Sequence, residues 1–320
     1  MENDSGMSSS HPERGGRPLV SVVLPTRNRL ELLRRAVNSV RAQSERRFEL
    51  IVVDDVSTDG THAYLEKLPT VDERIRVVRN AVPLGGGGAR NEGVRLSRGD
   101  WIAFLDDDDE WMPSKLERQL QALRPNPTAV ACSCGFIVRS ALRGSRVIAA
   151  QRNATLQQLL TYNCLGGASV CMCSREALRS VGAFDAKLKS VQDLDLWVRL
   201  RQRGNVAVCP EPLVVHHAHT GPRITTNSQS QYMGVRRFYF KHRTLMNSAT
   251  RGHWISYSCY VMSTQATRRL RRRLRFLAMA LLNSSPRHAL TFARRSAPRL
   301  VRDAFFRGLA LCRLRVLAGG

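Results

Sequence analysis

The chain has 320 residues, of which 43% are hydrophobic, and a net charge of +24 at pH 7. This length and composition allow a substantial buried core, which excludes a disordered protein and fits one large domain or two smaller ones. Residues 1–17 lack the apolar segment of a signal peptide, so we expect a tail there. No apolar run approaches the roughly 18 residues of a membrane-spanning helix.

The positive charge is concentrated at the C-terminal end. From Lys241 to Gly320 there are 17 Lys or Arg and one acid, Asp303, which accounts for +16 of the net +24. This change in composition predicts a helical basic extension at residues 226–320. A strongly basic chain is also typical of nucleic-acid-binding proteins, which keeps that function class open at this point.

Strands and helices alternate in the first hundred residues. Apolar runs predict strands at 19–24, 48–53, 75–78 and 101–105, and a helical pattern follows each of the first three. This alternation predicts an α/β fold with a mostly parallel sheet and helices on both faces. In such sheets ligands bind at the carboxyl ends of the strands.

Polar residues follow these strands. Asp54 and Asp55 end the second strand, where they would either hold a nucleoside base or ribose or cap the next helix. Gly85–Gly88 would allow a ligand to approach closely, or form a flexible linker. Arg90 then stands at a helix start, where it would face a diphosphate or solvent.

Five consecutive acids, Asp106 to Glu110, follow the fourth strand. Adjacent carboxylates repel one another unless water or a cation neutralises them, and oxygen ligands suit Mg²⁺ or Mn²⁺. The run therefore predicts a metal site with Asp106 and Asp108 as ligands; a solvated acidic loop is the alternative.

Asp193 stands at the front of a helix with an apolar repeat. A carboxylate there could take the proton of an attacking hydroxyl, or only cap the helix, and Asp195 is predicted to be structural. The eight cysteines lack the two-residue CxxC gap of zinc ligands, so we interpret them as reduced core residues of a cytosolic protein. His216, His217 and His219 suggest either a transition-metal site or a polar strand end.

Five motifs in this order resemble glycosyltransferase family 2, over about residues 19–220. They are Val22-Val23-Leu24-Pro25-Thr26-Arg27-Asn28, Val52-Val53-Asp54-Asp55-Val56-Ser57-Thr58-Asp59-Gly60-Thr61, Gly88-Ala89-Arg90-Asn91-Glu92-Gly93, Phe104-Leu105-Asp106-Asp107-Asp108-Asp109 and Gln192-Asp193-Leu194-Asp195-Leu196-Trp197-Val198-Arg199-Leu200. The resemblance implies a GT-A fold, a nucleotide-sugar donor, Mn²⁺ or Mg²⁺ at the Asp-x-Asp position and inversion at the anomeric carbon.

The resemblance also implies roles for single residues. Asp55 with Asp54 resembles the base-binding aspartate, Asp106 and Asp108 the metal pair, and Asp193 the catalytic base. His219 resembles a residue of the loop that closes over the donor diphosphate, and we expect it to be a metal ligand with Asp106 and Asp108. The sequence departs from the family at Val56, where Gly is usual, and at Gln192, where Glu is usual. We expect the donor site to include Pro25, Arg27, Asp54, Asp55, Arg90 and Asp107.

The implied enzyme transfers a hexose or N-acetylhexosamine from a nucleotide sugar, expected to be a UDP-sugar, to a glycan or lipid-linked acceptor in cell-surface polysaccharide or glycolipid synthesis. We place its donor half at residues 18–125 and its acceptor half at 126–225. Sugar transfer to polyprenyl phosphate is an alternative on the same fold. The acidic run would repel a phosphate backbone, so we expect no nucleic-acid partner.

The end of the chain predicts a basic amphipathic helix. Beyond Pro298, apolar residues such as Phe305 and Leu309 repeat every three or four positions, and arginines lie on another face. Such a helix would dock on an anionic membrane surface, bind a partner groove or present a solvated face. We expect a cytoplasmic enzyme at the inner face of the plasma membrane.

Overall fold

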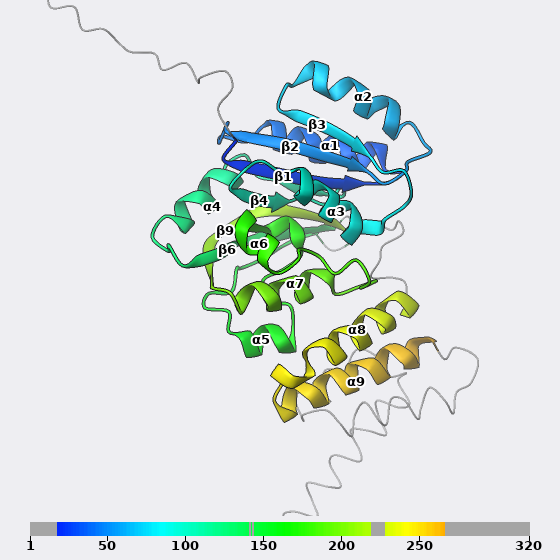
Figure 1. Cartoon of the computed structure of the whole chain (residues 1–320), viewed down its shortest axis with the longest axis vertical. Helices are drawn as coiled ribbons and strands as arrows, with labels where there is room; N and C mark the ends of the chain where they lie inside the picture. The colour runs from blue at the N-terminus through cyan, green and yellow to red at the C-terminus, as the bar shows by residue number, and fades with distance from the viewer. Residues whose placement is uncertain (1–17, 141, 143, 219–227, 266–320) are drawn as a thin grey trace, which may run out of the picture.

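A nine-stranded mixed sheet forms the centre of the computed structural model, which describes residues 18–140, 142, 144–218 and 228–265 (Figure 1). The strand order is β3-β2-β1-β4-β8-β6-β9-β5, with β7 paired to β6. The strands are β1 (Val20–Thr26), β2 (Phe48–Asp54), β3 (Ile75–Arg79), β4 (Trp101–Phe104), β5 (Asp109–Trp111), β6 (Ala129–Ser140), β7 (Gly144–Ile148), β8 (Cys171–Ser174) and β9 (Asn205–Ala218).

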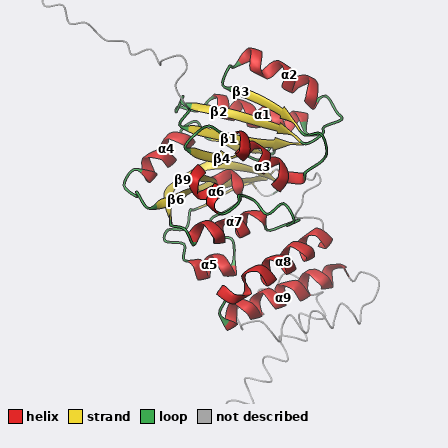
Figure 2. Cartoon of the chain, in the orientation of Figure 1, coloured by secondary structure: helices red, strands yellow, loops and turns green. Residues whose placement is uncertain are grey.

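Helices cover the sheet and extend beyond it (Figure 2). They are α1 (Leu30–Arg41), α2 (Thr61–Val71), α3 (Gly85–Leu96), α4 (Lys115–Leu123), α5 (Leu156–Thr161), α6 (Arg175–Ser180), α7 (Gln192–Arg201), α8 (Ser228–His242) and α9 (Ser248–Gln265), with 3-10 turns η1 (Ala168–Val170) and η3 (Arg243–Leu245). In the part of the chain that the structure describes, no helix has the length and apolar character needed to cross a bilayer.

The N-terminal half of the sheet is parallel, as predicted. β1 pairs in parallel with β2 and β4, and β2 with β3. Helices bury both faces of the central strands, and every residue of β2 is buried, whereas only Ile75 of β3 is buried. The carboxyl ends of β1, β2 and β4 therefore meet at one edge of the sheet.

The second half is mainly antiparallel, and it divides the acidic run. β8 pairs antiparallel with β4 and β6, while β5 pairs antiparallel with β9. Asp109 and Glu110 belong to β5, so only the first three acids occupy the turn after β4. The histidines His216 and His217 lie within β9, a single 14-residue strand that continues through Pro210 and Pro212.

Helices α8 and α9 share the hydrophobic core of the main body. Phe238 of α8 and Trp254 of α9 are buried, and their ring centroids lie 4.8 Å apart. Trp254 Nε1 donates to the carbonyl of Leu160 in α5 (2.6 Å), which joins α9 to α5. The basic run 268–275 and the repeat beyond residue 298 lie outside the described residues.

Candidate active site

A cleft of about 810 Å³ opens at the carboxyl ends of the parallel strands. The turns after β1, β2 and β4 form one side, and the start of α7 with β6 and β9 forms the other. Its lining includes Pro25, Arg27, Asp55, Arg90, Asp106, Asp107, Asp108 and Asp193 among the predicted residues, and Arg29, Asp109, Gln192, His216 and His217 besides them. Eight residues predicted from separate motifs thus share one cleft.

Two predicted residues are not in this lining. Asp54 is fully buried, and its Oδ1 accepts the backbone N–H of Ser57 (2.8 Å). It therefore holds the turn after β2. His219 lies outside the described residues.

Asp55 fixes the glycine-rich segment. Its Oδ1 accepts Asn80 Nδ2 (2.7 Å) and the N–H of Leu84 (2.8 Å), and its Oδ2 accepts the N–H of Gly85 (2.9 Å). Gly85–Gly88 form the first turn of α3 and are neither a linker nor a loop, although Gly85 has φ +71°. A Cβ on Gly87 would lie 3.1 Å from Gln192 Nε2, so glycine lets α3 approach the start of α7 closely.

Three acids converge at the centre of the cleft. One ligand oxygen from each of Asp106, Asp108 and Asp109 lies within 4.8 Å of the others. An oxygen-only set fits a hard divalent cation such as Mg²⁺ or Mn²⁺. Asp107 lines the cleft but does not belong to this group: it accepts hydrogen bonds from Thr26 Oγ1 (2.8 Å) and Arg29 Nη1 (2.9 Å), and burial raises its pKa to about 6 against those two partners.

Two arginines offset part of this negative charge. Arg90 is buried and pairs with Asp106, while Arg29 pairs with Asp107 and, at 3.4 Å, with Asp108. Burial alone would lower the pKa of Arg90, but Asp106 and Asp193 raise it above its ordinary value. Arg29 was not predicted, although it stands only two positions after Arg27.

Asp109 and His216 form a further unpredicted pair. Asp109 Oδ1 is hydrogen-bonded to His216 Nδ1 (2.7 Å), and Asp109 Oδ2 accepts Ser169 Oγ (2.6 Å). Burial would lower the pKa of His216, but this hydrogen bond raises it. The antiparallel pairing of β5 with β9 brings the two residues together, which no local sequence signal indicates.

Asp193 lies in the first turn of α7 and borders the cleft. Burial raises its pKa to about 6, Arg90 opposes this shift, and the charges of Asp106 and Asp109 add to it. Gln192, beside it, donates through Nε2 to the carbonyl of Leu188 (2.6 Å). A carboxylate with a pKa near 6 is ionised at neutral pH and still basic enough to accept a proton.

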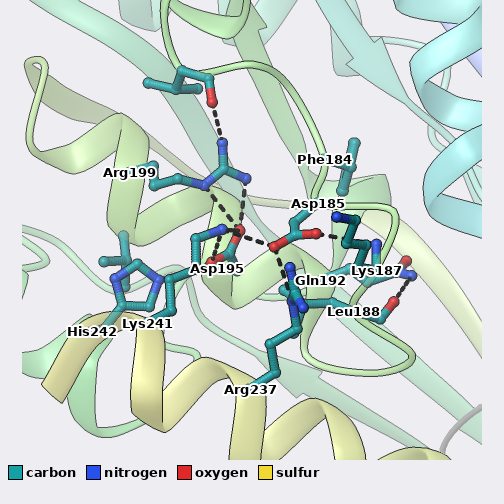
Figure 3. A network of polar contacts seen from close by, with 12 residues as sticks. Phe184, Asp185, Lys187, Leu188, Gln192, Asp195, Arg199, Arg237, Lys241 and His242 are labelled. Atoms are coloured by element: carbon teal, nitrogen blue, oxygen red, sulfur yellow. Dashed lines mark hydrogen bonds and ion pairs between the residues drawn. The ribbon is translucent and has the colours of Figure 1, made fainter.

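Asp195 has a different environment although it is only two residues away. It is fully buried and does not line the cleft. With Asp185 it forms the α7–α8 ion cluster, whose cationic members are Arg199, Arg237, Lys241 and His242 (Figure 3). Although burial would raise the pKa of Asp195, His242, Arg199 and Lys241 lower it to about 2.

Comparisons with known proteins identify a family for this chain. Residues 21–186 match glycosyl transferase family 2. A putative teichuronic acid biosynthesis glycosyltransferase of Bacillus subtilis is 29% identical over 230 residues, which cover 72% of this chain and 89% of the relative. The UDP-Glc:alpha-D-GlcNAc-diphosphoundecaprenol beta-1,3-glucosyltransferase of Escherichia coli is 30% identical over 189 residues, 59% of this chain and 72% of the relative.

Solved structures share the fold. S. aureus TarS in complex with UDP-GlcNAc matches with a TM-score of 0.60 at 17% identity, over 84% of this chain and 82% of that chain. A mannosyltransferase of Pyrobaculum calidifontis in complex with GDP-Man and Mn²⁺ matches with a TM-score of 0.58 at 19% identity, over 89% and 81% of the two chains. The predicted GT-A fold is confirmed.

Proposed function

From the finding that the chain is a glycosyltransferase and belongs to glycosyltransferase family 2, we propose that it transfers a sugar from a UDP-sugar to a lipid-linked glycan, with inversion and with the help of a divalent metal ion. The observation that carries this proposal is the occurrence of Asp193, with a pKa of about 6, in the same cleft as the three convergent acids.

The donor occupies the side of the cleft formed by the parallel strands. Asp55, Pro25 and Arg27 border the space for the nucleoside, because they lie at the carboxyl ends of β1 and β2, where α/β sheets bind nucleotides. Asp106, Asp108 and Asp109 would hold Mn²⁺ or Mg²⁺, which neutralises charge on the departing diphosphate when it is bound. Arg90 adds a fixed positive charge beside Asp106.

Asp193 acts as the general base. The acceptor hydroxyl oxygen attacks the anomeric carbon while the bond from that carbon to the diphosphate oxygen breaks. The hydroxyl proton passes to Asp193, and the nucleoside diphosphate leaves with the bonding electron pair. A single displacement of this kind inverts the anomeric carbon, and Asp193 supplies the base that it requires.

The acceptor is proposed from the relatives. The E. coli relative is named for a diphosphoundecaprenol-linked acceptor, as is a Campylobacter jejuni glucosyltransferase, and the B. subtilis relative is named for teichuronic acid biosynthesis. A lipid-linked intermediate of cell-surface polysaccharide fits all three. We place the enzyme at the cytoplasmic face of the membrane that carries this lipid.

The test is a transfer assay with radiolabelled UDP-glucose, UDP-GlcNAc and GDP-mannose, a diphosphoundecaprenol-linked N-acetylhexosamine acceptor and added Mn²⁺. We expect one UDP-sugar to yield a labelled lipid product, and EDTA to stop the reaction. Lack of turnover with all three donors, or full activity in EDTA, would contradict the proposal.

A further inference from the structure

The α7–α8 ion cluster joins α7, the helix of the proposed base, to α8, and both helices lie beyond the family-matched residues 21–186. Asp195 of α7 accepts Arg199 Nε of its own helix (2.9 Å) and His242 Nε2 of α8 (2.8 Å). Lys241 Nζ lies 2.8 Å from Asp195 Oδ1 and 3.1 Å from Asp185 Oδ2. Lys241 therefore bridges two carboxylates (Figure 3).

These two carboxylates flank the segment that enters the catalytic helix. Asp185 begins it and Asp195 follows it, with Ser190, Val191, Gln192 and Asp193 of the cleft lining between them. Val191 has φ +53°, in the left-handed region that a β-branched residue rarely adopts. Such a conformation is strained and persists only where the surrounding structure holds it.

The other end of α8 holds the same segment. Ser190 Oγ donates to the backbone carbonyls of Ser230 (3.2 Å) and Gln231 (3.3 Å). A Cβ on Gly234 would lie 2.7 Å from the carbonyl oxygen and 2.8 Å from the nitrogen of Ser190. Backbone therefore packs directly on backbone at this point, and glycine permits it.

Helix α3 holds the segment from the opposite direction. Asn91 Nδ2 donates to the carbonyl of Phe184 (2.8 Å), and its Oδ1 accepts the N–H of Phe184 (2.9 Å). The Phe184 ring lies 5.3 Å from the guanidinium of Arg90 in the cleft. The segment from 184 to 191 is thus fixed on one side by the donor half and on the other by α8.

We propose that α8 positions the catalytic base, with Lys241 as the positioning residue that ties Asp185 and Asp195 together across the segment that precedes Asp193. The proposal rests on the assignment of Asp193 as the base. In the contacts above, α8 touches none of the donor-side residues. Loss of the Lys241 bridge therefore slows the chemical step and leaves donor binding in place. A displacement of about 1 Å at a reacting group can lower a rate by as much as roughly 10²-fold.

The experiment compares three full-length variants in the transfer assay, with thermal unfolding measured in parallel. For Lys241→Gln we expect kcat to fall about tenfold and the donor KM to stay within about twofold, because the geometry of Asp193 changes and the donor contacts do not. Lys241→Arg keeps the bridging charge and should restore most of kcat. Arg236→Gln is the matched control, since Arg236 lies on the same helix and contacts the Phe240 ring at 5.7 Å.

The outcomes separate this inference from the proposed function. If Lys241→Gln has the same kcat as the control Arg236→Gln, the cluster has only a structural role and the inference is overturned. This holds whatever the melting temperature of Lys241→Gln. Failure of the wild-type enzyme to turn over any nucleotide sugar would instead remove the proposed function. If Lys241→Gln does not fold, Asp185→Asn takes its place, since it removes one of the two carboxylates that Lys241 bridges; a wild-type kcat there contradicts the inference equally.

Discussion

The cleft and the α7–α8 ion cluster shift the pKa values of their carboxyl groups in opposite directions. In the cleft, burial raises the pKa of Asp107 and Asp193 to about 6 and also raises that of Asp109. In the cluster, cations lower the pKa of Asp185 and bring that of Asp195 to about 2. Negative charge is in excess in the first region and neutralised in the second.

This difference distinguishes a binding site from an ion cluster that holds helices together. Carboxylates that exceed their cationic partners are a place for a metal ion or a proton, whereas carboxylates surrounded by arginine, lysine and histidine hold helices together. Asp193 and Asp195 lie two residues apart on one helix, and side chains two residues apart on a helix point to nearly opposite faces. One helix thus serves both regions.

The largest expected effect is the loss of activity on removal of a cleft acid. Asp108→Ala takes away one of three convergent oxygens, so we expect transfer to fall by roughly 10³-fold or more, on the scale of a lost electrostatic contribution to the transition state. The side chain is partly exposed and fills no core volume, so the melting temperature should change little. A transfer assay with a Mn²⁺ titration measures this, and activity at the wild-type level in the presence of EDTA would remove the metal role.

Removal of a carboxylate from the α7–α8 ion cluster should instead lower the stability of the fold. Asp195→Asn leaves the buried cations of the cluster without their counter-charge, so we expect the free energy of unfolding to fall by about 3 kcal/mol. The folded pKa of about 2 lies below the ordinary value near 4, so the Asp195 contribution is present above pH 4 and is lost as the pH falls through about 2. Urea unfolding at pH 7 and at low pH measures both; equal stability of wild type and variant at pH 7 would contradict the assigned role.

The pH dependence of the rate should follow the cleft acids. Asp193 must be ionised to accept a proton, so log kcat/KM should rise by about one unit per pH unit below a pKa of about 6 and level off above it. Asp107 titrates in the same range, and Asp107→Asn is the control that removes its contribution. An acidic limb near pH 4 in both enzymes would show that the base is not a buried carboxylate.

The smallest effect concerns the turn after β2. Val56 has φ +64°, a conformation that glycine adopts without the steric cost of a Cβ. We expect Val56→Gly to stabilise the fold by about 1 kcal/mol, the cost of a left-handed residue offset in part by the greater entropy of glycine in the unfolded chain. Thermal unfolding measures this gain, and a lower melting temperature would mean that the packing of the Val56 side chain outweighs the strain.

The sequence predicts the parallel half of the sheet and most of the cleft because both depend on short local patterns. Strand–helix alternation places the carboxyl ends of β1, β2 and β4 together, so motifs at those ends meet without knowledge of any long-range contact. The backbone at Val56 is a local feature of the same kind. Its positive φ is a conformation that suits glycine, the residue expected at this position from the sequence resemblance.

The remaining features depend on contacts between distant segments. Asp54 and Asp55 are adjacent, but Asp54 is the fully buried last residue of β2, and only Asp55, which follows the strand, lines the cleft. Asp109 meets His216 across 107 residues, and Asp195 meets His242 across 47. No periodicity or spacing in the sequence indicates such pairs. The place of Asp109 beside Asp106 and Asp108, and the α7–α8 ion cluster, could therefore not be predicted.

The most direct test of the account is a single-turnover measurement on Asp193→Asn at pH 7.5, with UDP-sugar affinity measured on the same protein. The amide keeps the shape of the carboxylate but cannot accept the acceptor's proton, so we predict a chemical step slower by roughly 10²-fold or more at unchanged donor affinity. A variant that reacts at the wild-type rate, or one that loses donor binding in proportion to rate, would contradict Asp193 as the catalytic base.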